Sequence, residues 1–180
     1  GALLFSCTGH VNAQSLTLRV DNIDQIVDSM TLEEKVNLLV GRNDYLFGGY
    51  EKLDKAPRVM DSSISGFTQV IPRLGIPATG LADGPAGAVV VTRPDSKKNY
   101  YATGFPIGSL LACSWNTGLV ETIGQAIGNE ILEYGVDVVL APGMNIHRSP
   151  LCGRNYEYFS EDPVLTGKIA AAYIRGVQSN

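Results

Sequence analysis

The amino-acid sequence predicts an α/β fold with parallel strands. Segments typical of buried strands alternate with segments whose apolar residues recur at helical spacing, and polar motifs follow two of the strands. The 180 residues suggest one domain, long enough to bury about 70% of the surface that its unfolded chain exposes. A closed barrel of eight strand-helix units takes about 250 residues, so this chain holds too few strands to close one.

Two helices are expected near the start of the folded region. Apolar residues recur at helical spacing over residues 22–30. Thr31 and Glu34 form the sequence pattern of a capping box, which starts a second helix, and Gly41 suits its end. From there to about residue 77 the chain is polar and rich in glycine, which is typical of a functional or mobile loop. The apolar stripe of the second helix is Val36, Leu39 and Val40.

Two short strands are expected next. Residues 78–82 predict a strand that runs into an Asp-Gly-Pro turn beginning at Asp83. Residues 105–112 predict another strand, which ends near Trp115. A tryptophan at the end of a strand is more often part of the core than a stacking platform, so we expect Trp115 to be buried.

The second half of the chain predicts a helix, a strand and a helix. Asn116 is placed to cap the first helix and Gly135 to end it. Residues 136–140 predict a strand buried on both faces, because a nearly continuous β-branched run is typical of a parallel sheet. Asp162 and Pro163 supply the cap and the first-turn proline of the last helix. The apolar face of the first helix is Leu119, Ile123, Ile127 and Ile131.

Composition excludes several classes of partner. The formal net charge is -4, the pI is about 5.1, and Lys and Arg are scattered, so nucleic acid is not an expected partner. No apolar run reaches the length of a membrane span. The chain has only His10 and His147, which indicate no metal site, and no motif indicates a cofactor. Cys113 and Cys152 could pair in a secreted protein, but we expect both to be buried free thiols.

Residues 1–20 are expected to be the remnant of a secretion leader. The apolar start lacks an initiating Met and a basic beginning, and two processing sites fit it. One is cleavage after Ala13, and the other is lipid attachment at Cys7. Either site predicts a periplasmic or extracellular protein, while a random apolar leader is the alternative.

The run of residues 153–163 indicates carbohydrate chemistry. It carries an arginine, three carboxylates and three aromatic residues. Aromatic faces stack on sugar rings, and a guanidinium and carboxylates pair with hydroxyl groups as donors and acceptors. Asp83 and Arg154 both follow predicted strands, at the edge where α/β barrels place their active sites. A loop that merely needs polar residues is the alternative.

Five segments, taken together in their order and spacing, resemble glycoside hydrolase family 3. They include the Asp-Gly-Pro turn at Asp83 and the Gly-Arg-Asn-Tyr-Glu run that contains Arg154. The resemblance covers nearly the whole chain after residue 20. The segments are residues 30–36, 71–77, 82–87, 141–148 and 153–163.

The resemblance implies that residues 21–180 are the N-terminal part of a (β/α)8 TIM-type barrel domain, an incomplete barrel preceded by a short helical segment. It implies a retaining, exo-acting β-glycosidase, most often a β-glucosidase that removes terminal non-reducing β-D-glucosyl residues from β-linked oligosaccharides or glycosides. The family's aspartate nucleophile and glutamate acid/base are expected beyond Asn180. The fragment is therefore predicted to be inactive without the missing C-terminal part. A β-xylosidase of the same family and a non-catalytic carbohydrate-binding module are the alternatives.

The resemblance also implies roles for single residues. Asp83 and Arg154 match the family residues that bind hydroxyl groups of the non-reducing-end sugar. Glu157 is expected to orient Arg154. Glu161 and Asp162 are assigned to the loop and to the start of the last helix rather than to catalysis.

Two further positions leave alternatives open. His147 is either a sugar contact or supporting residue, or a hydrogen-bonded loop histidine. Val89 stands where relatives commonly have an arginine. Either Arg93 reaches the pocket from a shifted loop, or one sugar contact is lost.

Overall fold

The computed structural model describes residues 16–41, 62–63, 65–92 and 99–180. Within them helices and short strands alternate along the chain, which confirms the α/β class. The two processing sites at Cys7 and Ala13, and the arginine at position 93, lie outside the described residues.

Both N-terminal helices form where the sequence predicts them. α1 spans Ile23–Ser29 and α2 spans Leu32–Val40. The Thr31 hydroxyl accepts from the Glu34 backbone N–H at 3.2 Å, and a Glu34 carboxylate oxygen accepts from the Thr31 N–H at 2.8 Å. The predicted capping box is therefore complete. Gly41 ends α2 with a φ of 67°, a conformation that glycine adopts without strain.

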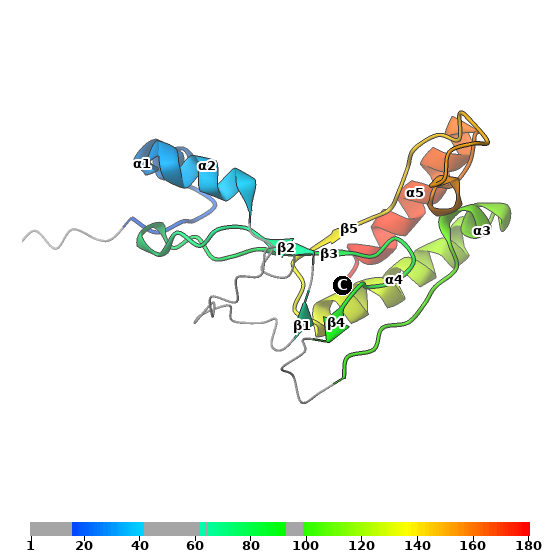
Figure 1. Cartoon of the computed structure of the whole chain (residues 1–180), viewed down its shortest axis with the longest axis horizontal. Helices are drawn as coiled ribbons and strands as arrows, with labels where there is room; N and C mark the ends of the chain where they lie inside the picture. The colour runs from blue at the N-terminus through cyan, green and yellow to red at the C-terminus, as the bar shows by residue number, and fades with distance from the viewer. Residues whose placement is uncertain (1–15, 42–61, 64, 93–98) are drawn as a thin grey trace, which may run out of the picture.

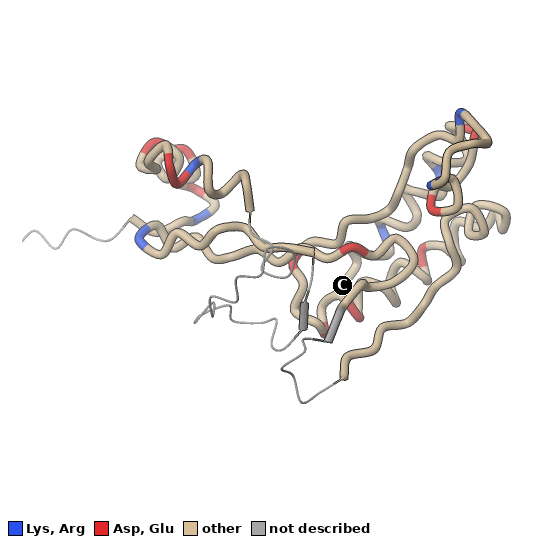
Figure 2. Tube along the Cα trace, viewed as in Figure 1, with Lys and Arg blue, Asp and Glu red and all other residues tan. Residues whose placement is uncertain are grey.

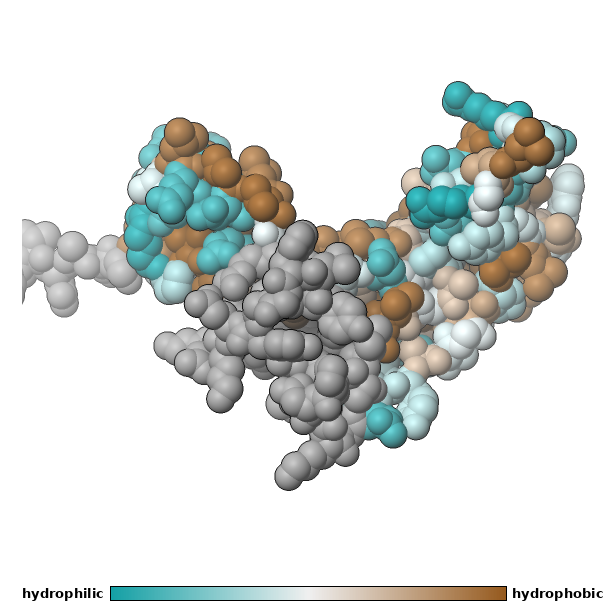
Figure 3. All heavy atoms as spheres, in the orientation of Figure 1, coloured by the Kyte–Doolittle hydropathy of each residue, from teal (hydrophilic) through white to brown (hydrophobic). Residues whose placement is uncertain are grey.

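The N-terminal region has a small core of its own. Ile26 and Met30 are buried against Ile71 and Leu74, at a single 3-10 turn, η1, that spans Pro72–Leu74. The expected apolar stripe of α2 is not buried in the described part of the chain, and it adds to the apolar surface at this end of the molecule (Figure 3). Its exposed members are Val36, Leu39 and Val40.

The main sheet has the strand order β2–β3–β5 (Figure 1). β3 spans Gly80–Asp83 and β5 spans Val138–Leu140, and the two strands run parallel. β2, at Gly66–Phe67, pairs with the other edge of β3 in the antiparallel direction. The parallel pairing that the sequence predicts is confirmed, with each strand starting two residues later than expected.

A second, smaller pair of strands lies apart from this sheet. β1 spans Ser62–Ser63 and β4 spans Val91–Thr92, and they pair antiparallel. This pairing of β1 with β4 brings together the two ends of the chain segment that contains β2 and β3.

β5 is less buried than the sequence predicts. Val138 is 39% exposed and Leu140 45% exposed, and only Val139 packs against the main core. Within the described sheet β5 has a neighbouring strand on one side only. The prediction of a strand buried on both faces is therefore wrong for this structure.

Residues 105–112 do not form the predicted strand. The backbone is extended at Ile107, and α3 then spans Gly108–Cys113. Gly108, Leu111 and Ala112 are its buried residues, which is the i, i+3, i+4 spacing of one helix face. A short apolar run cannot be assigned by its hydrophobicity alone, and here the spacing decides for a helix.

Two predictions of burial near α3 are also wrong. Trp115, expected in the core, is 76% exposed and has a φ of 52° in the turn that follows α3. Cys113 and Cys152 are free, as predicted, but both are exposed rather than buried.

The two long helices begin at the caps that the sequence predicts. α4 spans Thr117–Glu133, and the Asn116 side chain accepts from the Leu119 N–H at 3.0 Å. α5 spans Pro163–Val177, and an Asp162 carboxylate oxygen accepts from the first backbone N–H groups of this helix at 2.7 and 3.2 Å. Each cap satisfies donors that have no partner inside the helix.

Glycines bring α4 and α5 into close contact. A Cβ added to Gly124 would lie 2.5 Å from the carbonyl oxygen of Tyr173, and one added to Gly176 would lie 2.1 Å from that of Glu121. Only glycine leaves room for such an approach. Gly124 is one of the buried residues of α4. Leu119 is exposed, although the sequence places it on the apolar face of this helix. The buried residues of α4 are Val120, Gly124, Ile127, Gly128 and Ile131.

The elements form an elongated molecule (Figure 1). α1 and α2 lie at one end, α3, α4 and α5 lie toward the other, and the main sheet lies between them. The main core joins the sheet to α4 and α5. Acidic and basic residues are interspersed along the described chain (Figure 2). Within the described ranges, every helix is too short or too polar to span a lipid bilayer.

Candidate functional site

Asp83 is the last residue of β3, opposite Leu140 at the end of β5. Its exposed carboxylate accepts from the Ser65 hydroxyl at 2.9 Å, and the same hydroxyl accepts from the Asp83 N–H at 2.9 Å. The turn after Asp83 is closed by backbone bonds, from Gly87 N–H to the Gly84 carbonyl and from Val89 N–H to the Asp83 carbonyl. The carboxylate therefore remains free to accept from further donors.

Tyr173 ties the Asp83 turn to α5. Its hydroxyl donates to the Gly84 carbonyl at 3.2 Å in a buried position. Burial raises the pKa of the Tyr173 hydroxyl above its ordinary value, so the group keeps its proton and stays a donor. From the sequence, Tyr173 is expected only in the apolar stripe of the last helix. The polar hydroxyl of a tyrosine is the one sequence signal that it also donates a hydrogen bond to another element.

Arg154 precedes η2, a single 3-10 turn at Asn155–Glu157 that follows β5 in the chain. The Arg154 Nε donates to a carboxylate oxygen of Glu157, which is the expected ion pair. The Arg154 side chain is 72% exposed and that of Glu157 only 13%. The hydrogen bond that Arg154 donates to Glu157 raises the pKa of the guanidinium, which stays charged. Glu157 thus holds one edge of the guanidinium, and the terminal nitrogens remain as further donors.

Two glycines hold the backbone of this loop from two directions. A Cβ on Gly108 would lie 2.5 Å from the Glu157 carbonyl oxygen, and one on Gly143 would lie 2.9 Å from the Tyr158 ring. α3 therefore packs against the Glu157 backbone, and the segment after β5 packs against the Tyr158 ring. Neither contact is visible as a local sequence pattern.

Hydrogen bonds from the Ser109 side chain and from the His147 backbone hold the same loop at its centre and end. The Ser109 hydroxyl of α3 faces the carbonyl oxygens of Asn155, Tyr156 and Tyr158 at 3.0–3.1 Å. The backbone N–H of His147 donates to the Ser160 carbonyl at 3.2 Å. Asp162 then caps α5 as the sequence predicts. These bonds fix the path of the chain from η2 to α5.

His147 lies beneath the loop. Its ring is 6.3 Å from that of Tyr158, measured between centroids. Its Nε2 is buried and has no hydrogen-bond partner within the described part of the chain, and the same holds for Asn155 Oδ1. The backbone of His147 supports the loop, but its Nε2 does not make the hydrogen bond expected of a loop histidine.

The remaining candidates contribute less to this site. Glu161 is exposed beside the helix cap, and Val89 is exposed after the Asp83 turn. No hydrogen bond or ion pair joins Asp83 to Arg154 among the described residues. The parallel pairing of β3 and β5 nevertheless directs both chain segments to the same end of the sheet.

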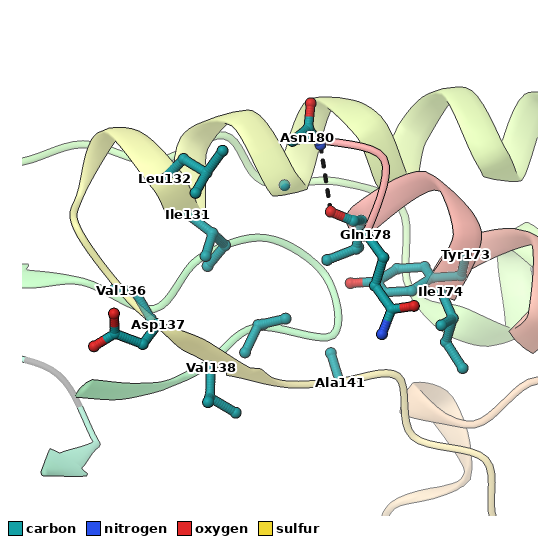
Figure 4. A pocket seen from close by; sticks show the side chains of 13 residues that line it. Ile131, Leu132, Val136, Asp137, Val138, Ala141, Tyr173, Ile174, Gln178 and Asn180 are labelled. Carbon is teal, nitrogen blue, oxygen red and sulfur yellow. Dashed lines mark hydrogen bonds between the residues drawn. The ribbon is translucent and has the colours of Figure 1, made fainter. Parts of the chain in front are cut away.

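A pocket of about 460 Å³ lies elsewhere, between β5 and the C-terminal halves of α4 and α5 (Figure 4). Its lining is mainly apolar and includes Ile131, Val138 and Ile174. The carboxylate of Asp137, also in the lining, accepts from the Gly80 N–H at 2.8 Å. Neither Asp83 nor Arg154 lines this pocket, so it is separate from the candidate site.

Comparison with known proteins places these residues in a described family. A model of the glycosyl hydrolase family 3 N-terminal domain matches residues 54–180. Thermostable beta-glucosidase B of Acetivibrio thermocellus is 41% identical, over 88% of this chain and 19% of its own length. Beta-glucosidase B of Emericella nidulans is 40% identical, over 88% of this chain and 16% of its own length.

A solved structure has a similar fold. Beta-glucosidase 3B of Thermotoga neapolitana, in complex with α-D-glucose, matches with a TM-score of 0.74 and 50% identity. The match covers 87% of this chain and 21% of that chain. The present chain thus spans roughly a fifth, or less, of the length of these relatives.

Proposed function

Because this chain belongs to glycoside hydrolase family 3, we propose that it is the N-terminal part of a retaining β-glucosidase. The enzyme removes glucosyl residues from the non-reducing ends of β-linked oligosaccharides and glycosides. The β-glucosidases that it resembles support this assignment. In the proposal, residues 21–180 form the first part of a (β/α)8 barrel in which β3 and β5 are strands, and the α1–α2 segment precedes that barrel.

The observation that carries the proposal is that Asp83 and Arg154 lie on chain segments that leave neighbouring parallel strands, β3 and β5, at the same end of the sheet. A sugar hydroxyl both donates and accepts, so it needs an acceptor and a donor. The exposed Asp83 carboxylate is an acceptor, and the terminal nitrogens of Arg154 are donors. Glu157 fixes the guanidinium by its Nε without occupying those nitrogens.

Two of the three carboxylates in residues 153–163 already have structural partners. A retaining glycosidase needs two carboxyl groups about 5–5.5 Å apart, one as nucleophile and one as acid/base. Glu157 is paired with Arg154, and Asp162 caps α5. We therefore place both catalytic groups beyond Asn180. The 180-residue chain by itself is expected to leave 4-nitrophenyl β-D-glucoside unhydrolysed.

The proposal is tested in the protein expressed from its complete gene. We expect Asp83→Asn and Arg154→Lys each to lower kcat/KM for 4-nitrophenyl β-D-glucoside roughly 10- to 150-fold, because a hydrogen bond to a charged group contributes about 1.5–3 kcal/mol. Glu161→Gln is the matched control, since it removes a carboxylate of the same loop that is not assigned to the sugar. Its kcat/KM should stay near that of the unchanged protein.

The same assay separates the alternatives. Faster hydrolysis of the β-D-xyloside than of the glucoside would identify a β-xylosidase. Glucose binding by calorimetry with no hydrolysis of any glycoside would identify a binding module. Full activity in both the Asp83 and the Arg154 variants would contradict the assignment of the sugar site.

A further inference from the structure

Ser109 occupies a position that the proposed chemistry does not by itself explain. It lies in the first turn of α3, and its hydroxyl faces the carbonyl oxygens of Asn155, Tyr156 and Tyr158 at 3.1, 3.1 and 3.0 Å. A hydroxyl carries one proton, so these three acceptors share a single donor. All three belong to η2 or to the residue that directly follows it.

The carbonyls that Ser109 contacts lie along η2 and at its end. The Asn155 carbonyl also accepts from the Tyr158 N–H at 3.2 Å, which closes the turn, whereas the last carbonyls of a helical turn have no partner inside it and need a donor from elsewhere. η2 is only three residues long and no side-chain hydrogen bond caps its N-terminus, so side-chain bonds from the Ser109 hydroxyl and from Asn155 Nδ2 to the Ser149 carbonyl support it. The neighbouring Gly108 sets the distance, because the α3 backbone there lies against the Glu157 carbonyl.

The support passes from Ser109 to Arg154 through one residue. η2 ends at Glu157, and the mostly buried Glu157 carboxylate holds the Arg154 Nε. Ser109 makes no hydrogen bond to Arg154 itself. A displacement of η2 would therefore move the guanidinium while leaving its charge and its ion pair in place.

We propose that Ser109 is the positioning residue for Arg154, so that α3 sets how tightly the site binds the non-reducing-end sugar. This inference rests on the proposed function of Arg154. The sugar hydroxyl bonds of Arg154 exist before and during the reaction, so their loosening should raise KM more than it lowers kcat.

The test uses the enzyme expressed from its complete gene, with 4-nitrophenyl β-D-glucoside as substrate and glucose as competing ligand. Ser109→Ala is expected to raise KM and the inhibition constant of glucose by up to roughly 100-fold, because a misplacement of about 1 Å can cost that much. kcat should change far less. Ser109→Thr keeps the hydroxyl and should retain most of the affinity.

The matched control is Ser114→Ala. The Ser114 hydroxyl, directly after α3, also donates to a carbonyl, that of Leu111 at 2.6 Å, but within the described chain it makes no hydrogen bond to the η2 loop. This variant should keep the KM of the unchanged enzyme. Thermal melts of all variants check that each is folded at the assay temperature.

A double-mutant cycle gives the deciding result. If Ser109 acts through Arg154, the effect of Ser109→Ala on KM should vanish in an Arg154→Lys background. An equal effect in both backgrounds would overturn the inference and leave Ser109 as a structural residue. If Arg154→Lys alone changes nothing, the proposed function of Arg154 fails instead, so the two failures are distinguishable.

Discussion

Gly108 and Gly143 show that uncharged atoms decide where Arg154 lies. Gly108 approaches the Glu157 carbonyl, and Gly143 approaches the Tyr158 ring, more closely than a Cβ would allow. The loop is therefore held by backbone contacts from α3 and from the segment after β5. These contacts fix the position of the backbone to which the ion-paired side chains of Arg154 and Glu157 are attached.

Gly108→Ala tests this contact. The new methyl group would meet the Glu157 carbonyl oxygen at 2.5 Å, and we expect a loss of about 1–3 kcal/mol in the free energy of unfolding, as for other overpacked sites. Urea unfolding measures it. Gly104→Ala is the control, because a Cβ there meets no atom within 4 Å. Equal stability of the two variants would contradict the account.

The sequence predicts some of these residues and not others. Arg154 and Glu157 are three positions apart, so their pairing follows from local spacing, and it forms. The Ser109 hydroxyl meets carbonyls 46, 47 and 49 residues away, and Tyr173 meets one 89 residues away. Such contacts depend on how whole elements pack, and no short pattern in the sequence encodes them.

At the scale of elements, caps were predictable and short apolar runs were not. Thr31, Asn116 and Asp162 each cap the helix that the sequence assigns to them. A cap is a local hydrogen bond between near neighbours, and its residue types are few. The prediction of a strand at residues 105–112 was wrong because eight residues give too little period to separate a helix from a strand.

Gly124→Ala and Gly167→Ala form a pair that separates helix propensity from helix packing. Both replace glycine inside a helix, where alanine favours the helix by about 1 kcal/mol. A Cβ at Gly167 meets no atom within 4 Å, so Gly167→Ala should raise the free energy of unfolding. A Cβ at Gly124 meets the Tyr173 carbonyl at 2.5 Å, so Gly124→Ala should lower it by about 1–3 kcal/mol. Stabilisation by both variants, in urea melts, would show that α4 and α5 do not pack this closely.

The start of α2 responds to acid. Arg73 donates to both carboxylate oxygens of Glu34, and this pair, followed by the bond from the Thr31 N–H, lowers the pKa of Glu34 from 4.5 to about 2. A lowered carboxyl pKa favours the folded state above the unfolded value. That contribution is therefore present above pH 4.5 and is lost as the pH falls toward 2.

A carboxyl titration followed by NMR measures this directly. The Glu34 resonance should have its midpoint near 2, and Arg73→Gln should move the midpoint up toward 4.5. Asp21, whose pKa is lowered by Arg19 rather than by Arg73, is the internal control and should keep its midpoint in the variant. An unchanged Glu34 midpoint in Arg73→Gln would contradict the assigned cause.

For the whole molecule, the α/β class and the parallel strand pair follow from the sequence. The run at 136–140 and the strand before Asp83 are each recognisable, and the intervening helices make a parallel pairing the expected one. The antiparallel addition of β2 was not predictable. It is two residues long, and so short a segment has no detectable period.

Two separate cores predict two levels of stability. The buried residues around α1 number far fewer than those joining the sheet to α4 and α5. Regions with few buried apolar contacts open without unfolding the remainder. Amide hydrogens of α1 should therefore exchange at least about tenfold faster, relative to their intrinsic rates, than those in the centre of α4. Equal protection of both helices would indicate one cooperative unit.

The bond between Ser65 and Asp83 has a consequence for how the chain can be shortened. Ser65 precedes β2, far before Asp83 in the sequence, yet its hydroxyl is bonded to both the backbone and the carboxylate of Asp83. A truncation that began after β2 would keep every residue assigned to the sugar and still release Asp83 from this partner. Under the proposed function, a unit that binds a sugar through Asp83 in this geometry therefore has to include Ser65.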